Sequence, residues 1–149
     1  MSKSSRAQRS DLVAAAFLTA LLLASCAPAT EPCTATVSVL GTWRYSAVQQ
    51  APVHTTLSGT LSVTKQSCAD FTGQLDLIEV TPQGGTRRIA GPLSGKLIDA
   101  TSVRFDAFLE ALPRQHLGSL SGNALEGTWL VLDGSGQSLS GTFGGQREK

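Results

Sequence analysis

Leu125-Glu126-Gly127-Thr128-Trp129 is the clearest copy of a pattern that recurs along this chain: an apolar residue, any residue, Gly, any residue and a second apolar residue. Copies also begin at residues 39, 57, 71, 93 and 139. Alternate residues of a β-strand point to the same face, so the apolar side chains and the glycines share one side of each segment. The other side carries mainly Ser, Thr, Gln and Lys, which suits contact with water.

Glycines on the apolar face predict a strongly curved sheet. Gly weakens a flat strand, but in a coiled strand it relieves crowding on the concave side. Closing such a sheet on itself would also remove its exposed edges. We therefore predict an all-β fold, an eight-stranded antiparallel up-and-down meander barrel. Its strands are expected near residues 41–49, 54–65, 69–80, 86–98, 101–110, 115–121, 124–132 and 137–146.

Turn residues separate these segments. Gly84-Gly85, Pro113, Gly122-Asn123 and residues 133–136 are expected to mark the turns. Residues 108–112 could form a helical turn that Pro113 stops, but no segment has a sustained helical period.

The N-terminal residues have the pattern of an export signal. Residues 1–11 are polar and basic, and Leu12–Ala24 is an apolar run broken only by Thr19. This run is shorter than the about 20 residues that a spanning helix needs. The segment that follows, Leu23-Ala24-Ser25-Cys26, resembles the lipobox of bacterial lipoproteins. The resemblance implies cleavage before Cys26 and diacylglycerol on its thiol.

Lipid on Cys26 would anchor the protein to a membrane of the bacterial cell envelope. By the same resemblance, Ala27 implies the outer membrane if the host has two membranes. The alternative is an ordinary secretory signal followed by an incidental cysteine. The expected domains are a signal peptide at 1–25, a lipidated cysteine and short tether at 26–33, and a β-barrel at 34–149.

Two further cysteines remain in the exported part, Cys33 and Cys68. An even pair in an oxidising compartment predicts a disulfide. It would close a loop spanning 35 residues, and the disputed chain-entropy model gives such a loop about 4 kcal/mol. The net charge of only +1 gives no electrostatic basis for binding nucleic acid.

Aromatic and apolar residues of the recurring pattern are expected to point inward. They either fill the barrel as its core or line an apolar cup for a ligand at one end. The set of interior or ligand-lining residues is Trp43, Tyr45, Leu61, Leu75, Phe105, Trp129 and Phe143.

Gly41-Thr42-Trp43 resembles the Gly-x-Trp start of the first strand in the calycin group, the lipocalins and avidins. The resemblance implies a small meander barrel. The lipocalin Thr-Asp-Tyr element and C-terminal helix are absent, and so are the additional pocket tryptophans of avidin, so biotin binding is not implied. In lipocalins a basic residue after the last strand covers the first-strand Trp, a role open here to Arg147, Arg104 or Arg44.

No catalytic, cofactor or metal motif is readable in the sequence. His54 and His116 are expected to be solvated, as are the four carboxylates that could pair, Asp76, Glu79, Asp106 and Glu110. We therefore expect a protein that is not an enzyme.

The remaining function is binding, either of an apolar or amphipathic small molecule or of another envelope protein. The alternative is an inhibitor of lysozyme or proteases, acting through the loop from Ala111 to His116. If the first and last strands pair, the barrel is closed and a monomer is expected.

Overall fold

The computed structural model describes residues 33, 37–110, 112–132 and 138–149. These residues contain no helix and eight strands: β1 (Gly41–Ala51), β2 (Thr55–Ser67), β3 (Asp70–Val80), β4 (Thr86–Leu97), β5 (Ser102–Leu109), β6 (Leu112–Ser121), β7 (Ala124–Leu132) and β8 (Ser138–Arg147). Consequently, the described part of the chain offers no helix long and apolar enough to cross a membrane.

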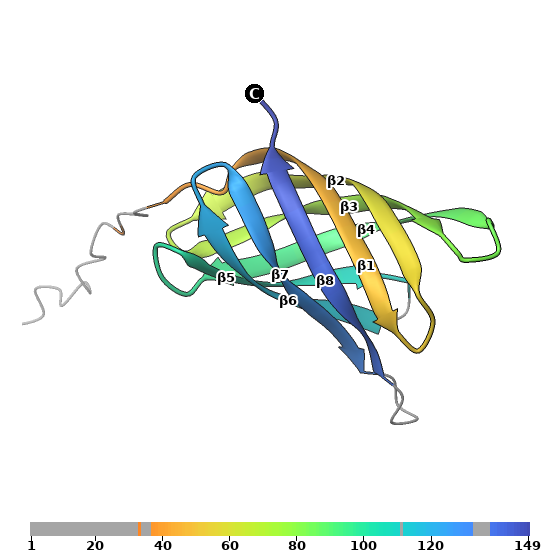
Figure 1. Cartoon of the computed structure of the whole chain (residues 1–149). Coiled ribbons are helices and arrows are strands. Elements are labelled where there is room, and N and C mark those ends of the chain that lie inside the picture. Colours follow the sequence, from red (N-terminus) through yellow and green to blue (C-terminus); the bar gives the residue numbers. More distant parts are fainter. Residues whose placement is uncertain (1–32, 34–36, 111, 133–137) are drawn as a thin grey trace, which may run out of the picture. The chain divides into compact units, whose positions relative to one another are not determined.

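Each strand pairs antiparallel with the next one in sequence, and β8 pairs with β1 to close the barrel (Figure 1). The predicted meander barrel is therefore confirmed. The predicted turn at residues 133–136 lies outside the described residues, as do the signal peptide, Cys26 and the tether up to Pro32.

The start of β6 differs from the prediction. Pro113 does not mark a turn, because it lies in the strand opposite Phe108. The chain reverses earlier, around Glu110, whose φ is +60°. Proline is tolerated near the start of a strand, and β6 pairs with β7 only from Gln115 onward. The loop expected at 111–116 is therefore wrong, since residues 112–116 belong to β6.

The inward glycines let neighbouring strands approach closely. A Cβ atom built on Gly59, Gly73 or Gly127 would come under 3.0 Å from a backbone carbonyl oxygen of the adjacent strand. Real Cβ atoms essentially never make such contacts. Only glycine therefore fits at these positions, where adjacent strands approach too closely for a side chain.

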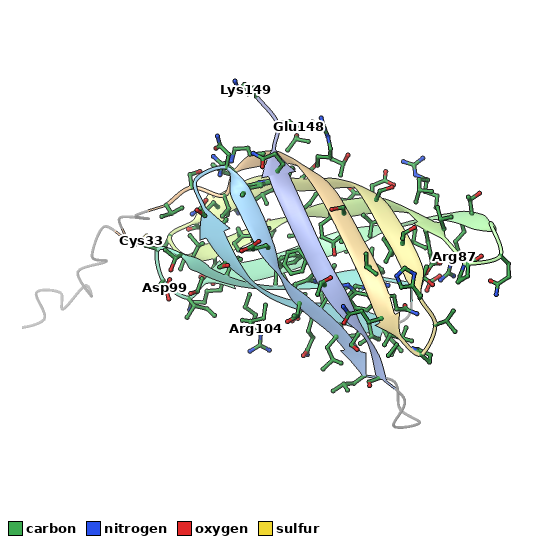
Figure 2. The ribbon with its side chains drawn as sticks, in the orientation of Figure 1. Cys33, Arg87, Asp99, Arg104, Glu148 and Lys149 are labelled. Carbon is green, nitrogen blue, oxygen red and sulfur yellow. A yellow bond between two sulfur atoms is a disulfide. The ribbon has the colours of Figure 1, made fainter. Side chains whose placement is uncertain are left out.

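The barrel has two distinct ends. We call the end that holds Cys33 and the β4–β5 turn the disulfide end. The opposite end, which holds the β1–β2 and β3–β4 turns, is the far end. Figure 2 shows Cys33 and Asp99 at the first and Arg87 toward the second.

Val37 and Val39, which precede β1, pack against the core at the disulfide end. Cys33 and Cys68 form a disulfide with their Cα atoms 5.3 Å apart. The Gln66 side chain accepts from the Val39 N–H at 2.9 Å and donates to the Val37 carbonyl at 2.9 Å. The Arg147 guanidinium lies 4.5 Å from the centre of the Trp43 ring, so of the three arginines considered it is Arg147 that covers this tryptophan.

Candidate functional site

Polar side chains gather inside the barrel toward the far end. Five polar or charged residues are buried among the described residues: Gln49, Thr55, Glu79, Arg114 and His116. The expectation of solvated side chains at Glu79 and His116 is therefore wrong. Glu79 has the same strand parity as the buried Leu75 and Leu77, and His116 has the same parity as the buried Leu120.

The deepest of these polar groups form a hydrogen-bonded chain. The Tyr45 hydroxyl lies 3.0 Å from His116 Nε2, and His116 Nδ1 lies 2.9 Å from the Arg114 carbonyl oxygen. Burial lowers the pKa of His116 to about 3 and raises the pKa of Tyr45 above its usual range. At neutral pH both side chains are uncharged, so Tyr45 donates to Nε2 and the Nδ1–H donates to the carbonyl.

Aromatic rings hold this chain in place. The His116 ring stacks on Phe105 at 4.2 Å between centroids and meets Phe143 edge-on at 5.0 Å. Because His116 binds the carbonyl of Arg114, the same packing fixes the backbone from which the Arg114 side chain extends.

Two other buried polar groups at this end already have partners. Glu79 forms an ion pair with Arg87, which also pairs with the half-exposed Glu110. The side-chain amide of Gln49 donates to the Val53 carbonyl at 2.9 Å. Glu79 and Gln49 therefore form hydrogen bonds within the protein and do not require a ligand as a partner.

Arg114 differs from them. Only 6% of the residue is exposed, and its guanidinium lies 4.2 Å from the centre of the Trp129 ring. Burial lowers the pKa of Arg114, yet arginine keeps its charge in proteins. Among the described residues, no acceptor binds Arg114 Nε, Arg114 Nη1 or Trp129 Nε1, although all three are buried. A buried donor without a partner costs about 1–3 kcal/mol.

The interior near the disulfide end is packed. The void there measures about 10 Å³ and is lined by core residues that include Trp43, Leu61 and Phe105. That volume holds one water at most. An apolar cup for a ligand therefore does not exist at this position.

The structure places all seven predicted interior residues inside the barrel, each at most 5% exposed. All seven belong to one hydrophobic core, within which they have different neighbours. Tyr45, Phe105 and Phe143 pack together around His116, whereas Trp43 borders the void at the disulfide end and Trp129 lies beneath Arg114. Trp129 was therefore predicted as an interior residue from its sequence pattern, whereas Arg114, His116 and Glu79 were not.

Metal-binding geometry is not evident in the described part of the chain, where no three His, Cys, Asp or Glu side chains gather. His54 lies exposed in the β1–β2 connection. The loop from Ala111 to His116 that the inhibitor hypothesis required is not present as predicted, because Arg114 and His116 are buried residues of β6.

Comparisons with known proteins identify the fold alone. No family model and no curated protein sequence matches the chain. Among solved structures, it is similar to EF1p2_mFAP2b bound to DFHBI, with a TM-score of 0.60, 13% identity and coverage of 73% of this chain and 93% of that one. A redesigned β-barrel, mFAP1, bound to DFHBI gives a TM-score of 0.52, 17% identity and coverage of 72% and 94%.

A natural protein also shares the architecture. A protein of unknown function from Bacteroides ovatus matches with a TM-score of 0.51 and 10% identity, over 72% of this chain and 41% of that one. The two solved barrels that this chain resembles are thus both bound to the small molecule DFHBI.

Proposed function

We propose that this chain is a non-catalytic binding barrel of the bacterial cell envelope, and that it takes a small ligand at the far end. The observation that carries the proposal is the contrast between the two ends. The disulfide end is packed, with a void of about 10 Å³, whereas the far end buries the cation of Arg114 with unused donors. The DFHBI-bound barrels support it, since folds of this kind can hold a small molecule.

The absence of catalysis is part of the proposal. The histidine at this end is 1% exposed, and both of its ring nitrogens are engaged, by Tyr45 and by a backbone carbonyl. A general base must reach the proton that it abstracts. His116 is instead enclosed by aromatic rings, which suits a structural role.

The envelope location rests on the sequence. Signal peptide 1–25 and lipid on Cys26 would place the barrel at a membrane surface, with Cys33 only a few residues from the anchor.

Native mass spectrometry of the protein from Ala27 onward, extracted from the envelope without denaturation, tests this function. We expect a discrete extra mass that disappears on denaturation. A bare protein mass, with no binding of any small-molecule probe, would contradict the small-ligand proposal and leave a protein partner as the function to pursue.

A further inference from the structure

The barrel contains two tryptophan–arginine pairs, one toward each end. Each tryptophan closes a Gly-Thr-Trp sequence, at Trp43 in β1 and Trp129 in β7. Each is buried and covered by a guanidinium, at 4.5 Å for Arg147 over Trp43 and 4.2 Å for Arg114 over Trp129. The hydrogen bonds of one pair can therefore be compared directly with those of the other.

At the disulfide end the chain itself supplies the hydrogen-bond acceptors. Trp43 Nε1 donates to the Val39 carbonyl at 3.0 Å, and Arg147 Nη2 donates to the Ser38 carbonyl. Only Arg147 Nε is left buried without a partner. Two oxygen atoms of the N-terminal segment thus satisfy this pair.

At the far end, no described residue supplies a hydrogen-bond acceptor to these donors of the Trp129–Arg114 pair. Trp129 Nε1, Arg114 Nε and Arg114 Nη1 are all buried donors without acceptors. Glu79, the buried carboxylate at this end, is engaged by Arg87. The unsatisfied atoms are donors only, and one of the two side chains carries a positive charge.

Gly141 lets the edge of the Trp129 indole pack directly against the backbone of β8. It lies opposite Trp129 in the β7–β8 pairing, and a Cβ at this position would come within 2.8 Å of Trp129 Nε1. Any larger residue would press against the edge of the indole ring that carries the free N–H.

We propose that the far end binds an organic acid, whose carboxylate oxygens accept hydrogen bonds from Arg114 and Trp129. A carboxylate supplies two acceptor oxygens and a charge that matches the guanidinium. Buried apolar residues of the inner wall near this end, Ile89, Leu109 and Val131, suit an apolar portion of the same ligand. This inference rests on the proposed function, since it names the class of ligand for that site.

The two tryptophans give a direct test by nuclear magnetic resonance. Isotope-labelled tryptophan in the protein from Ala27 onward, which contains the whole compact unit Cys33–Lys149, yields two indole N–H signals. We expect decanoate to shift the Trp129 signal saturably and to leave the Trp43 signal in place. Decanol, which has the same chain without the charge, and inorganic phosphate should leave both signals unchanged.

Variants assign the effect to the named side chains. Arg114→Gln should weaken decanoate binding by about tenfold or more, because it removes the charge. Arg104→Gln is the matched control, because Arg104 is exposed and points away from the barrel (Figure 2), and it should bind as the parent does. If Arg114→Gln fails to fold, judged by loss of the Trp43 signal, Trp129→Phe replaces it. Because this variant lacks the Trp129 indole signal, its decanoate binding and that of the parent are measured by isothermal titration calorimetry, and the variant should bind severalfold more weakly.

Each contrary outcome is distinct. Equal shifts with decanol and decanoate would overturn the carboxylate while leaving a ligand-binding barrel, and a response to phosphate alone would overturn the organic acid. Failure of every probe, with a bare mass from the envelope extract, would remove the proposed function as well.

Discussion

His116 is a neutral histidine inside the barrel, and its burial makes folding sensitive to acid. Burial lowers the pKa of His116 to about 3, whereas an unfolded histidine titrates near 6.5. The unfolded chain therefore takes up this proton first as the pH falls. The stability that His116 contributes is fully present above about pH 6.5 and is lost progressively toward about pH 3.

Urea unfolding at about pH 7 and about pH 5 measures this contribution. We expect the parent protein to lose about 2 kcal/mol between these conditions from His116. His116→Phe should lose much less over the same interval, whatever its absolute stability. The control is His54→Gln at the exposed histidine, which should keep the parent's dependence, and an undiminished dependence in His116→Phe would show that other groups cause it.

The Tyr45 hydroxyl satisfies a buried ring nitrogen. Tyr45→Phe removes the donor that lies 3.0 Å from His116 Nε2, so the free energy of unfolding should fall by about 1–3 kcal/mol. The double variant Tyr45→Phe with His116→Phe should cost less than the sum of the single changes, because both polar partners are then replaced by apolar rings. Strictly additive costs in urea unfolding would argue against a direct bond between the two side chains.

At this scale the sequence predicted apolar residues better than polar ones. Alternation alone places Glu79 on the inner face with Leu75 and Leu77, but a lone carboxylate is rarely buried unless it has a partner. Its partner Arg87 lies on the next strand, and no local sequence pattern predicts an ion pair between residues of two different strands. Arg114 was missed for a different reason, because it was assigned to a loop in which alternation has no meaning.

At the scale of the element, two of the three glycines in β8, Gly141 and Gly144, have different surroundings. A Cβ on Gly141 would come under 3.0 Å from the Val48 carbonyl, whereas the nearest atom to a Cβ on Gly144 is 3.8 Å away. Gly141→Ala should therefore lower the free energy of unfolding by about 1–3 kcal/mol through overpacking. Gly144→Ala should change it by less than about 0.5 kcal/mol, as surface changes usually do, and comparable losses in thermal unfolding would show that close approach is not the reason for Gly141.

Strands with this glycine pattern could be predicted from the sequence, because glycine is required where adjacent strands leave no space for a side chain. Where no local steric requirement exists, as at the start of β6, the boundary could not be read. Proline is frequent in turns, which is why a turn was predicted at Pro113, yet the chain turns at Glu110, which has a positive φ. The pairing of β5 with β6 decides that boundary, and such a pairing is a property of two strands together.

At the scale of the whole molecule, closure governs association. Since β1 and β8 pair along their length, the described barrel leaves no edge strand for a second chain to extend. We expect a monomer of the protein from Ala27 onward by light scattering after gel filtration. A stable dimer would require an interface on the outer wall, and its loss on substituting the exposed Leu117 with Ser would locate that interface on β6.

Anchoring is the remaining property of the whole molecule, and it depends on one atom. If lipid on the Cys26 thiol holds the barrel at the membrane, Cys26→Ser should move the protein from the membrane fraction to the soluble fraction, because acyl chains provide the membrane affinity. The barrel should stay folded, since the disulfide joins Cys33 and Cys68 and does not involve Cys26. Labelling with a clickable fatty acid should mark the parent protein and not the variant. A Cys33→Ser variant serves as the control, because it also loses a cysteine but should remain labelled and membrane-bound. Equal fractionation of the parent and Cys26→Ser would mean that the signal is an ordinary secretory one.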